Sequence, residues 1–597
     1  MPSIDTTTAS LPASMKSRER RALGIPLPPI PDNMTIPQFI FESDHECRPQ
    51  RRAGVPWLIQ DDNGKQFGEE ELRARTHALA NGLHLKYNIG ENDVAAIMSN
   101  PLLQNFHILL PALIRDDSQT TLSPFGQYTD SGVSYLRRGR TRGLKWNLPY
   151  FPSCLPSSGA NPDYTSSELL YQLQATNAAV IMVHPESLSI ALDAAREAGL
   201  PSARVVLFDV SHNTTSGEVL RGSSHETISS LVEFGMKNKV GYVERRLAPG
   251  EAKTKLAFLS FSSGTTGRPK AVAIPHFALI ANVIQIAAHN KVNQNYCDWN
   301  DQRFRPGDVA IGVLPFYHIY GLVINLHYIL FCGHPATKKY DLRKHIRMIM
   351  CGAAPLSHEL NQQLFSMFPD AHIGQAYGMT ETCTATTMWP ITRKRGVSGS
   401  SGHLLPGIVA RVVKQDGTLA DYGEAGELIV WTPSVALGYA NNAEATKETF
   451  LDGWVRTGDE VKIMEDGEMI VLDRLKEIMK VKGFQVAPAE LEGCLLDHPD
   501  VSNTCVVGIP DEYSGEVPLA YVVLTADASK RASQSAAAAE AIKASIIKHV
   551  AQNKIHYKHL VGGVEFVSAI PTSPSGKLLR RVLRDQAKEL RKVKAKL

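Results

Sequence analysis

The chain has 597 residues, which is more than one hydrophobic core usually supports, so its length predicts two or more domains. Hydrophobic residues make up 43% of the chain and charged residues 21%, proportions typical of an ordinary soluble globular protein. The formal net charge of +3 is too small to indicate nucleic acid or a membrane surface as a partner.

The chain begins with a proline-rich stretch over residues 1–35, for which we expect an extended arm. Regular patterns follow it. They predict a helix from Glu69 to about Tyr87, a strand over 94–98 and a second helix from Pro101 to Ile114. Because strands alternate with helices, the pattern indicates an α/β sheet.

Residues 116–157 interrupt this alternation, since they follow neither a helical nor a strand period. A structureless loop of this length is rare inside a compact domain, so we interpret the segment as an aberrant insertion. Its basic cluster over 137–145 is better explained by a solvated loop than by contact with nucleic acid. Beyond it the alternation resumes, with helices and strands predicted over 167–176, 178–183, 190–198 and 205–208.

The most informative segment runs from Ser262 to Lys270, between two β-prone runs over 256–261 and 271–274. Its glycines permit a tight turn in which backbone amides and hydroxyl groups face an anion, so we expect a phosphate site. A Walker loop is excluded because its glycines and lysine have a different spacing. A flexible surface loop is the alternative explanation. The candidate phosphate-binding residues are Ser262, Ser263, Gly264, Thr265, Thr266, Gly267 and Lys270.

The most apolar stretch covers residues 311–333 and contains Pro315, His318, Asn325 and His327. This polar content favours a buried strand and helix over a membrane span, so no transmembrane segment is expected. The eight cysteines lie far apart without a C-x-x-C pair, which argues against a zinc site and a disulfide framework. A reducing intracellular compartment fits this pattern best.

Further motifs accompany the phosphate segment in a fixed order: Leu314–Gly321, Cys351–Pro355, Gln375–Glu381, Thr457–Asp459, Asp473–Lys476, Lys480–Gln485 and Pro571–Lys577. The ordered set resembles the adenylate-forming superfamily, in particular the acyl-CoA synthetases of the 4-coumarate-CoA ligase and luciferase branch. The resemblance covers residues 26–114 and 158–597, and it departs from the family at Ala271, where glycine is usual. It implies an α/β fold with a large N-terminal AMP-binding domain of βαβ sheets over 36–474 and a small, rotating α+β C-terminal lid domain over 477–597.

The resemblance implies ATP, Mg²⁺ and CoA as ligands. The turn over 262–270 would hold the β- and γ-phosphates of ATP, and Glu381 would hold Mg²⁺, which prefers oxygen ligands. Tyr377 would stack on the adenine and Thr380 would contact the α-phosphate. Considered alone, Glu381 could also be an ordinary carboxylate at a helix N-terminus. The other residues expected at the nucleotide are Gly352, Ala353, Ala354, Pro355, Gln375 and Gly378.

Asp459 and Arg474 match the ribose positions of the family. A carboxylate such as that of Asp459 suits this role because it can accept hydrogen bonds from both ribose hydroxyls. For Asp459 considered alone, a Gly-Asp turn is the alternative. Lys476 matches the hinge at which the C-terminal domain begins.

Three motifs, each containing a lysine or a histidine, match the catalytic positions of the family. Lys577 matches the lysine that bridges the carboxylate and the α-phosphate during adenylation, although a surface lysine would have the same local sequence. Lys480 and the CoA-binding Gly483 match the face that the rotated domain presents for thioester formation. His318 resembles an acyl-pocket residue near the reacting carboxyl group, and a buried structural histidine is its alternative.

The implied activity is that of an ATP-dependent acyl- or aryl-CoA ligase, in which a carboxylate attacks the α-phosphate of ATP and the acyl-AMP then reacts with CoA. The sequence does not name the acid, and a hydroxycinnamate, a phenylacetate or a fatty acid would fit. A luciferase-type oxygenase on the same fold and a catalytically impaired nucleotide-binding relic are the alternatives.

A strand, helix and strand that the family places between the His318 motif and the Gly352 motif are missing near residues 333 and 334. The gap amounts to about one βαβ unit, roughly 30 to 40 residues. Losing an interior strand leaves backbone groups unpaired, and that loss exceeds the about 5 to 15 kcal/mol by which typical domains are stable. We therefore expect the chain as written to be a poor enzyme. It would be either the product of a coding sequence that kept an intron and dropped an exon, or a divergent relic.

The last predicted helix, over 577–596, carries nine basic and two acidic residues, a pattern typical of a solvated face. Ala595-Lys596-Leu597 resembles the Ser-Lys-Leu peroxisomal address, with alanine in place of serine. We therefore expect a peroxisomal import receptor as a partner and a peroxisomal location, or otherwise a cytoplasmic one.

Overall fold

The computed structural model describes residues 19–22, 24–48, 58–59, 66–90, 92–98, 156–162, 164–209, 219, 222–241, 244–262, 269–304, 346–352, 356, 358–475, 477–482, 484–511, 513–572 and 578–594. Several features singled out in the sequence lie outside these residues. They are the predicted helix over 101–114, all but the last two residues of the insertion, the apolar stretch over 311–333 and the gap near 333 and 334.

A seven-stranded sheet organises the first half of the large domain, in the order β16-β9-β8-β5-β4-β6-β7. Strands β8, β5, β4, β6 and β7 run parallel to one another, whereas β9 pairs antiparallel with β8 and with β16 at one edge. Every residue of β4 is buried, as expected for a strand covered on both faces. The bounds are β4 Val94–Met98, β5 Ser157–Ala160, β6 Ala178–Val183, β7 Val205–Leu207, β8 Leu256–Ser262, β9 Lys270–Pro275 and β16 Gly438–Tyr439.

The helices around this sheet begin and end at ordinary signals. Helix α3, Glu69–Tyr87, coincides with the predicted one and has three glutamates in its first turn, where they complement the helix dipole. It packs against α8, Ile228–Lys237, so tightly that a Cβ on Gly235 would lie 1.8 Å from the Ala78 carbonyl oxygen. The other helices here are α2 Ile36–Glu42, α5 Ser166–Thr176, α6 Leu188–Glu197 and α9 His276–His289.

A second sheet, in the order β1-β14-β15-β18-β17 with β19 beside β18, is antiparallel throughout. The N-terminal arm contributes its edge strand, because Arg20 and Arg21 pair with Ala410 and Val409. The bounds are β1 Arg20–Arg21, β14 Val409–Val413, β15 Gly426–Trp431, β17 Phe450–Leu451, β18 Trp454–Ile463 and β19 Met469–Arg474, with helix α13 Ala443–Thr449 before β17.

A third sheet has the strand order β10-β11-β12-β13. Strand β10 is parallel to β11, and β11, β12 and β13 form antiparallel pairs. The bounds are β10 Met348–Cys351, β11 His372–Met379, β12 Thr384–Met388, β13 His403–Leu404 and helix α12 His358–Met367, and a separate pair joins β2 Leu58–Ile59 to β3 Gln66–Phe67.

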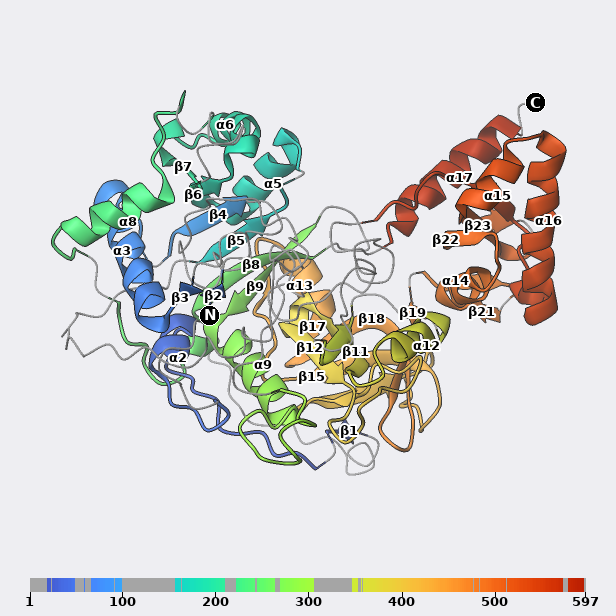
Figure 1. Ribbon diagram of the computed structural model, residues 1–597, viewed down its shortest axis with the longest axis horizontal. Coiled ribbons are helices and arrows are strands. Elements are labelled where there is room, and N and C mark those ends of the chain that lie inside the picture. The colour runs from blue at the N-terminus through green and yellow to red at the C-terminus, as the bar shows by residue number, and fades with distance from the viewer. Residues whose placement is uncertain are drawn as a thin grey trace.

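The C-terminal elements gather at one end of the molecule around their own five-stranded sheet (Figure 1). They confirm the expected small α+β domain. The last helix begins at Arg580, three residues after the predicted start. No helix in the described part of the chain is long and apolar enough to cross a membrane. The bounds are β20 Met479–Val481, β21 Phe484–Val486, α14 Pro488–Leu496, β22 Val501–Asp511, β23 Gly515–Leu524, α15 Ala526–Ala532, α16 Ala536–Asn553, β24 Gly563–Phe566 and α17 Arg580–Lys594.

Candidate functional site

The two strands on either side of the phosphate segment form the antiparallel pair that the sequence predicts. The last residue of β8, Ser262, is paired with the first residue of β9, Lys270. The Tyr171 hydroxyl of α5 donates a hydrogen bond to the carbonyl of Pro269, the residue directly before β9, at 2.9 Å. The strands thus bring both ends of the segment together. The residues between them, Ser263, Gly264, Thr265, Thr266 and Gly267, lie outside the described residues.

Three residues of the predicted nucleotide set converge on one carboxylate. Asp459 and Arg474 are directly paired across β18 and β19, and the Arg474 Nε atom lies 3.6 Å from Asp459 Oδ1. Tyr377, on β11, donates a hydrogen bond to Asp459 Oδ2 at 2.6 Å. The structure therefore brings together residues that are more than 80 positions apart in the sequence, around a carboxylate that is 9% exposed.

The titration of this group reflects its burial. Burial raises the pKa of Asp459 above its ordinary value, although the positive charge of Arg474 acts in the opposite direction. Burial and the neighbouring Asp459 carboxylate also raise the pKa of Tyr377, so its hydroxyl keeps its proton and can act as a donor. Such a carboxylate, with fixed donors nearby, is suited to accept hydrogen bonds from two neighbouring hydroxyl groups.

Glu381 lies one residue after Thr380 in a short 3-10 turn, Thr380–Thr382, that follows β11. Its side chain is buried, and the Tyr439 hydroxyl of β16 donates a hydrogen bond to its Oε1 atom at 2.7 Å. The Lys270 ammonium group lies 4.9 Å from the centre of the Tyr439 ring. The candidate metal ligand and the candidate phosphate-binding lysine therefore contact the same tyrosine.

The backbone after Glu381 is strained. Cys383 has φ 55° and Thr384 has φ 106°, a conformation that a β-branched residue rarely adopts. Gly378 allows the hairpin to close there, because a Cβ at this position would lie 1.5 Å from the Thr384 carbonyl oxygen. Strain of this kind persists only where the surrounding structure holds it, and it is common at binding sites.

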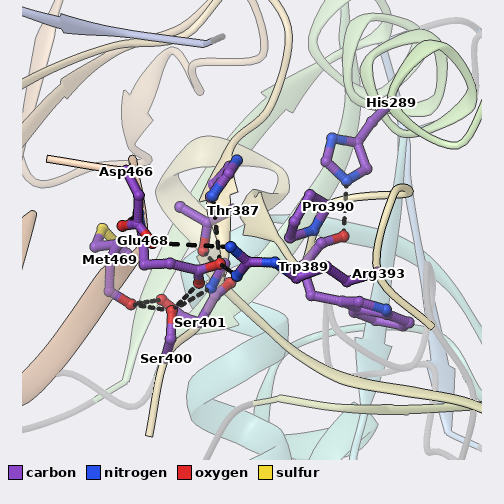
Figure 2. Close-up of polar contacts among 12 residues, drawn as sticks. His289, Thr387, Trp389, Pro390, Arg393, Ser400, Ser401, Asp466, Glu468 and Met469 are labelled. Atoms are coloured by element: carbon purple, nitrogen blue, oxygen red, sulfur yellow. Dashed lines mark hydrogen bonds and ion pairs between the residues drawn. The ribbon is translucent and has the colours of Figure 1, made fainter. Parts of the chain in front are cut away.

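Gln375 connects the site to a buried polar network, and Figure 2 shows the part of that network around Ser400 and Glu468. Its Oε1 accepts from the Leu356 amide at 2.9 Å, and its Nε2 donates to the Ser400 carbonyl at 3.4 Å. The Ser400 hydroxyl donates to Glu468, which also pairs with Arg393, each at 2.5 Å. Burial alone would raise the pKa of Glu468, but hydrogen bonds from His403 and Ser400 hold it below its ordinary value. The network thus fixes the strand that carries Gln375 and Tyr377.

A second charged cluster joins the C-terminal domain to β19. The Arg580 guanidinium of α17 pairs with Glu477 and with Glu492, the latter at 2.6 Å, and lies 4.0 Å from Asp473. Asp473 also accepts a hydrogen bond from the Ala489 amide of α14, at 3.0 Å. One cation thus holds three carboxylates from both sides of position 476, the predicted hinge.

The remaining predicted residues are less completely placed. Gly352 lies, half-buried, just after β10. Lys480 is exposed on β20, and its backbone amide donates to Glu516 rather than to any nucleotide residue. Besides the five residues of the phosphate segment, seven more predicted residues lie outside the described part of the chain: His318, Ala353, Ala354, Pro355, Lys476, Gly483 and Lys577.

Sequence reasoning missed Tyr439 and Tyr171. Tyr439 is 58 positions after Glu381, in a Gly-Tyr pair that carries no spacing signal, and only the pairing of β16 with β9 places it beside Lys270. Tyr171 lies within a predicted helix, where a tyrosine has no particular meaning. No local pattern in the sequence could have identified either residue.

Comparison with known families gives two matches. The family described as AMP-binding enzyme matches residues 155–337 and 327–440, and the AMP-binding enzyme C-terminal domain matches residues 490–577. The first match is divided into two segments that overlap at 327–337.

Curated relatives cover most of the chain. It is 32% identical to the probable 4-coumarate–CoA ligase 3 of Dictyostelium discoideum over 511 residues, covering 75% of this chain and 86% of that protein. It is 30% identical to the acyl-CoA ligase AFT1-1 of Alternaria alternata over 633 residues, covering 96% and 98%.

Solved structures show the same fold. The ATP-bound MatB of Rhodopseudomonas palustris matches with a TM-score of 0.68 and 22% identity, covering 94% of this chain and 99% of that chain. The anthranilate CoA ligase AuaEII with anthranoyl-AMP matches with a TM-score of 0.65 and 18% identity, covering 94% and 98%.

Proposed function

The chain belongs to the AMP-binding enzyme family, and we propose that it is an AMP-forming acid–thiol ligase that joins a carboxylic acid to CoA through an acyl adenylate. In the first step the carboxylate attacks the α-phosphate of ATP and pyrophosphate leaves. In the second step the CoA thiol attacks the acyl carbon and AMP leaves. The observation that carries this proposal is the convergence of Tyr377 and Arg474 on the buried Asp459 carboxylate.

Asp459 and Lys270 each have a part in binding the nucleotide in this proposal. We assign Asp459 to the ribose hydroxyls, because one of its oxygens contacts Arg474 and the other Tyr377 in a site that excludes most water. Lys270 stands at the end of the phosphate segment, where its ammonium group offsets phosphate charge. Fixed charges of this kind act on the charge that develops as the phosphate reacts, and require no protein nucleophile.

Glu381 fits the role of a Mg²⁺ ligand. Its carboxylate is 6% exposed, and within the described residues no lysine, arginine or histidine nitrogen lies within 4.0 Å of it. A buried carboxylate without a cation is costly, and hard cations such as Mg²⁺ prefer oxygen ligands. When bound, Mg²⁺ would neutralise part of the phosphate charge.

The names of the relatives guide the choice of acid. We propose an aryl acid such as a hydroxycinnamate or a phenylacetate, with a fatty acid as the second candidate, because the relatives are 4-coumarate– and acyl-CoA ligases. A panel of these acids, assayed for pyrophosphate release with ATP and then for CoA-ester formation, tests the class. The proposal would be contradicted if none of these acids led to pyrophosphate release either with this chain or with its intact relative.

The half-reactions test the two lysines. Lys577→Ala should depress acyl-AMP formation at least tenfold more than transfer from supplied acyl-AMP to CoA, because its ammonium group offsets the repulsion between carboxylate and phosphate; a tenfold rate difference corresponds to about 1.4 kcal/mol. Lys480→Ala should show the opposite pattern if the C-terminal domain rotates between steps. Equal losses in both half-reactions would contradict the assignment of either lysine.

We also propose that the chain as written is impaired by a missing βαβ unit near residues 333 and 334. Two observations support this: the family match divides at 327–337, and the alignment with the Alternaria ligase spans 633 positions, more than the 597 residues of this chain. Sequencing the transcript is the direct test. Purified protein of this sequence with ordinary ligase rates would contradict the impairment.

We also propose that the protein is imported into peroxisomes by a receptor that recognises the tripeptide Ala595-Lys596-Leu597.

A further inference from the structure

We infer that Tyr439 is a positioning residue, which holds one oxygen of the Glu381 carboxylate and leaves the other directed to a divalent cation, while its ring supports the Lys270 ammonium group. The inference rests on the proposed function, because it concerns the metal and phosphate side of the same nucleotide site. It adds a residue that none of the sequence motifs contains.

Backbone hydrogen bonds hold Tyr439 beside β9, the strand that begins at Lys270. Residues on both sides of it are bonded to β9, since the Leu437 amide donates to Ala273 and the Ala440 amide donates to Ala271, each at 2.8 Å. Its own amide donates to the Thr446 hydroxyl at 2.9 Å. Since β9 begins at Lys270, any tyrosine at this position lies next to that lysine.

The hydroxyl group of Tyr439 acts on Glu381. It donates to Oε1 at 2.7 Å, and among the described residues it is the one hydrogen-bond donor to this side chain. Within the described part of the chain, the Oε2 atom has no hydrogen-bond donor and is available to a cation. A tyrosine hydroxyl ordinarily keeps its proton at neutral pH, so it can act as the donor in this hydrogen bond.

The ring of Tyr439 acts separately on Lys270. The ammonium nitrogen lies 4.9 Å from the ring centre, within the range of a cation–π contact. Phe450 supports the ring edge-on, with the ring centres 5.6 Å apart and the planes at 73°. Since Tyr439→Phe removes only the hydroxyl, and Tyr439→Leu removes the ring as well, the two variants separate the two contacts.

The test measures binding rather than turnover, so it works even if the chain is impaired. Mn²⁺ affinity is measured by electron paramagnetic resonance in the presence of a non-hydrolysable ATP analogue, and metal-free analogue affinity is measured by calorimetry in EDTA. We expect Tyr439→Phe to weaken Mn²⁺ binding about tenfold, as for loss of a hydrogen bond to a charged group, with metal-free analogue affinity and melting temperature near wild type. Tyr439→Leu should weaken both affinities.

Tyr171→Phe is the matched control, because it removes a tyrosine hydroxyl that bonds Pro269 of the same segment but does not contact Glu381. Its Mn²⁺ affinity should stay within about twofold of wild type, a change well below that of a lost charged hydrogen bond. Equal Mn²⁺ affinity in wild type and Tyr439→Phe would overturn the inference. So would equal losses of metal and metal-free binding in Tyr439→Phe, which indicate a merely structural tyrosine.

A wild-type protein that binds the analogue no better with Mn²⁺ than without it would also overturn the inference, because Glu381 would then hold no cation. The proposed function is judged separately, by pyrophosphate release, so the two can fail independently.

Discussion

Replacing Arg580 by methionine should destabilise the C-terminal domain more than any exposed substitution in the same helix. The Arg580 side chain is 11% exposed and faces the carboxylates of Asp473, Glu477 and Glu492, which are 5%, 13% and 10% exposed. Methionine keeps most of the volume and the apolar stem of arginine but removes the charge. Three buried carboxylates would then remain without their cation.

The magnitude follows from the burial of the cluster. Removing one partner of a buried ion pair typically costs about 3 to 5 kcal/mol, against the about 5 to 15 kcal/mol by which typical domains are stable. We therefore expect a domain that is folded but opens far more often. Arg580→Lys, which keeps the charge but cannot bond several carboxylates in one plane, should recover part of the loss.

The pH dependence of the stability loss in Arg580→Met gives an independent check on its electrostatic origin. Burial already raises the pKa of Glu492 and of Asp473 in the presence of Arg580, and removing the cation raises each of them further. A carboxyl group with a raised folded-state pKa contributes stability below its unfolded pKa, and this contribution is lost as pH rises through the folded pKa. The loss of C-terminal domain stability in Arg580→Met relative to wild type should therefore be smaller at pH 5 than at pH 7.5.

Thiol labelling of Cys505 reads out this domain. Cys505 lies on β22 with 0% exposure, so a reagent reaches it only when the domain opens. No tryptophan occurs after residue 454, so tryptophan fluorescence reports on the large domain alone and should be unchanged. Arg581→Met, at an exposed position of the same helix, is the control and should stay within about 0.5 kcal/mol of wild type. Equal labelling rates of Cys505 in Arg580→Met and Arg581→Met would refute the reasoning. So would a stability loss in Arg580→Met that grows toward acid pH.

Two further predictions concern the nucleotide site and the C-terminal tripeptide. Asp459→Asn removes the charge that faces Arg474 but keeps an acceptor for Tyr377. KM for ATP should rise about tenfold, the loss typical of a charged hydrogen bond, while KM for CoA stays near wild type. Parallel changes in both KM values would contradict a ribose role for Asp459. A fluorescent protein fused to the last dozen residues should become punctate in cells, and fluorescence that is diffuse with or without Leu597 would reject the peroxisomal address.

Local patterns in the sequence by themselves determined the elements whose residues are close together in the chain. The apolar run over 94–98 and the helical period from Glu69 to Tyr87 became β4 and α3 with the predicted bounds. The hairpin of β8 and β9 likewise follows from two β-prone runs around a glycine-rich turn. Each of these depends on side-chain period, capping or turn chemistry, which act over a few residues.

The tertiary structure alone decided which distant residues meet. Asp459 faces Arg474 because of the register of β18 and β19, and Tyr439 reaches Glu381 because the short strand β16 adds to β9. Residues 20 and 21, within the predicted N-terminal arm, likewise form an edge strand of a sheet whose other strands lie almost 400 positions later in the chain. Strand pairing and burial depend on contacts across the whole chain, and no local pattern records which partner a strand will find.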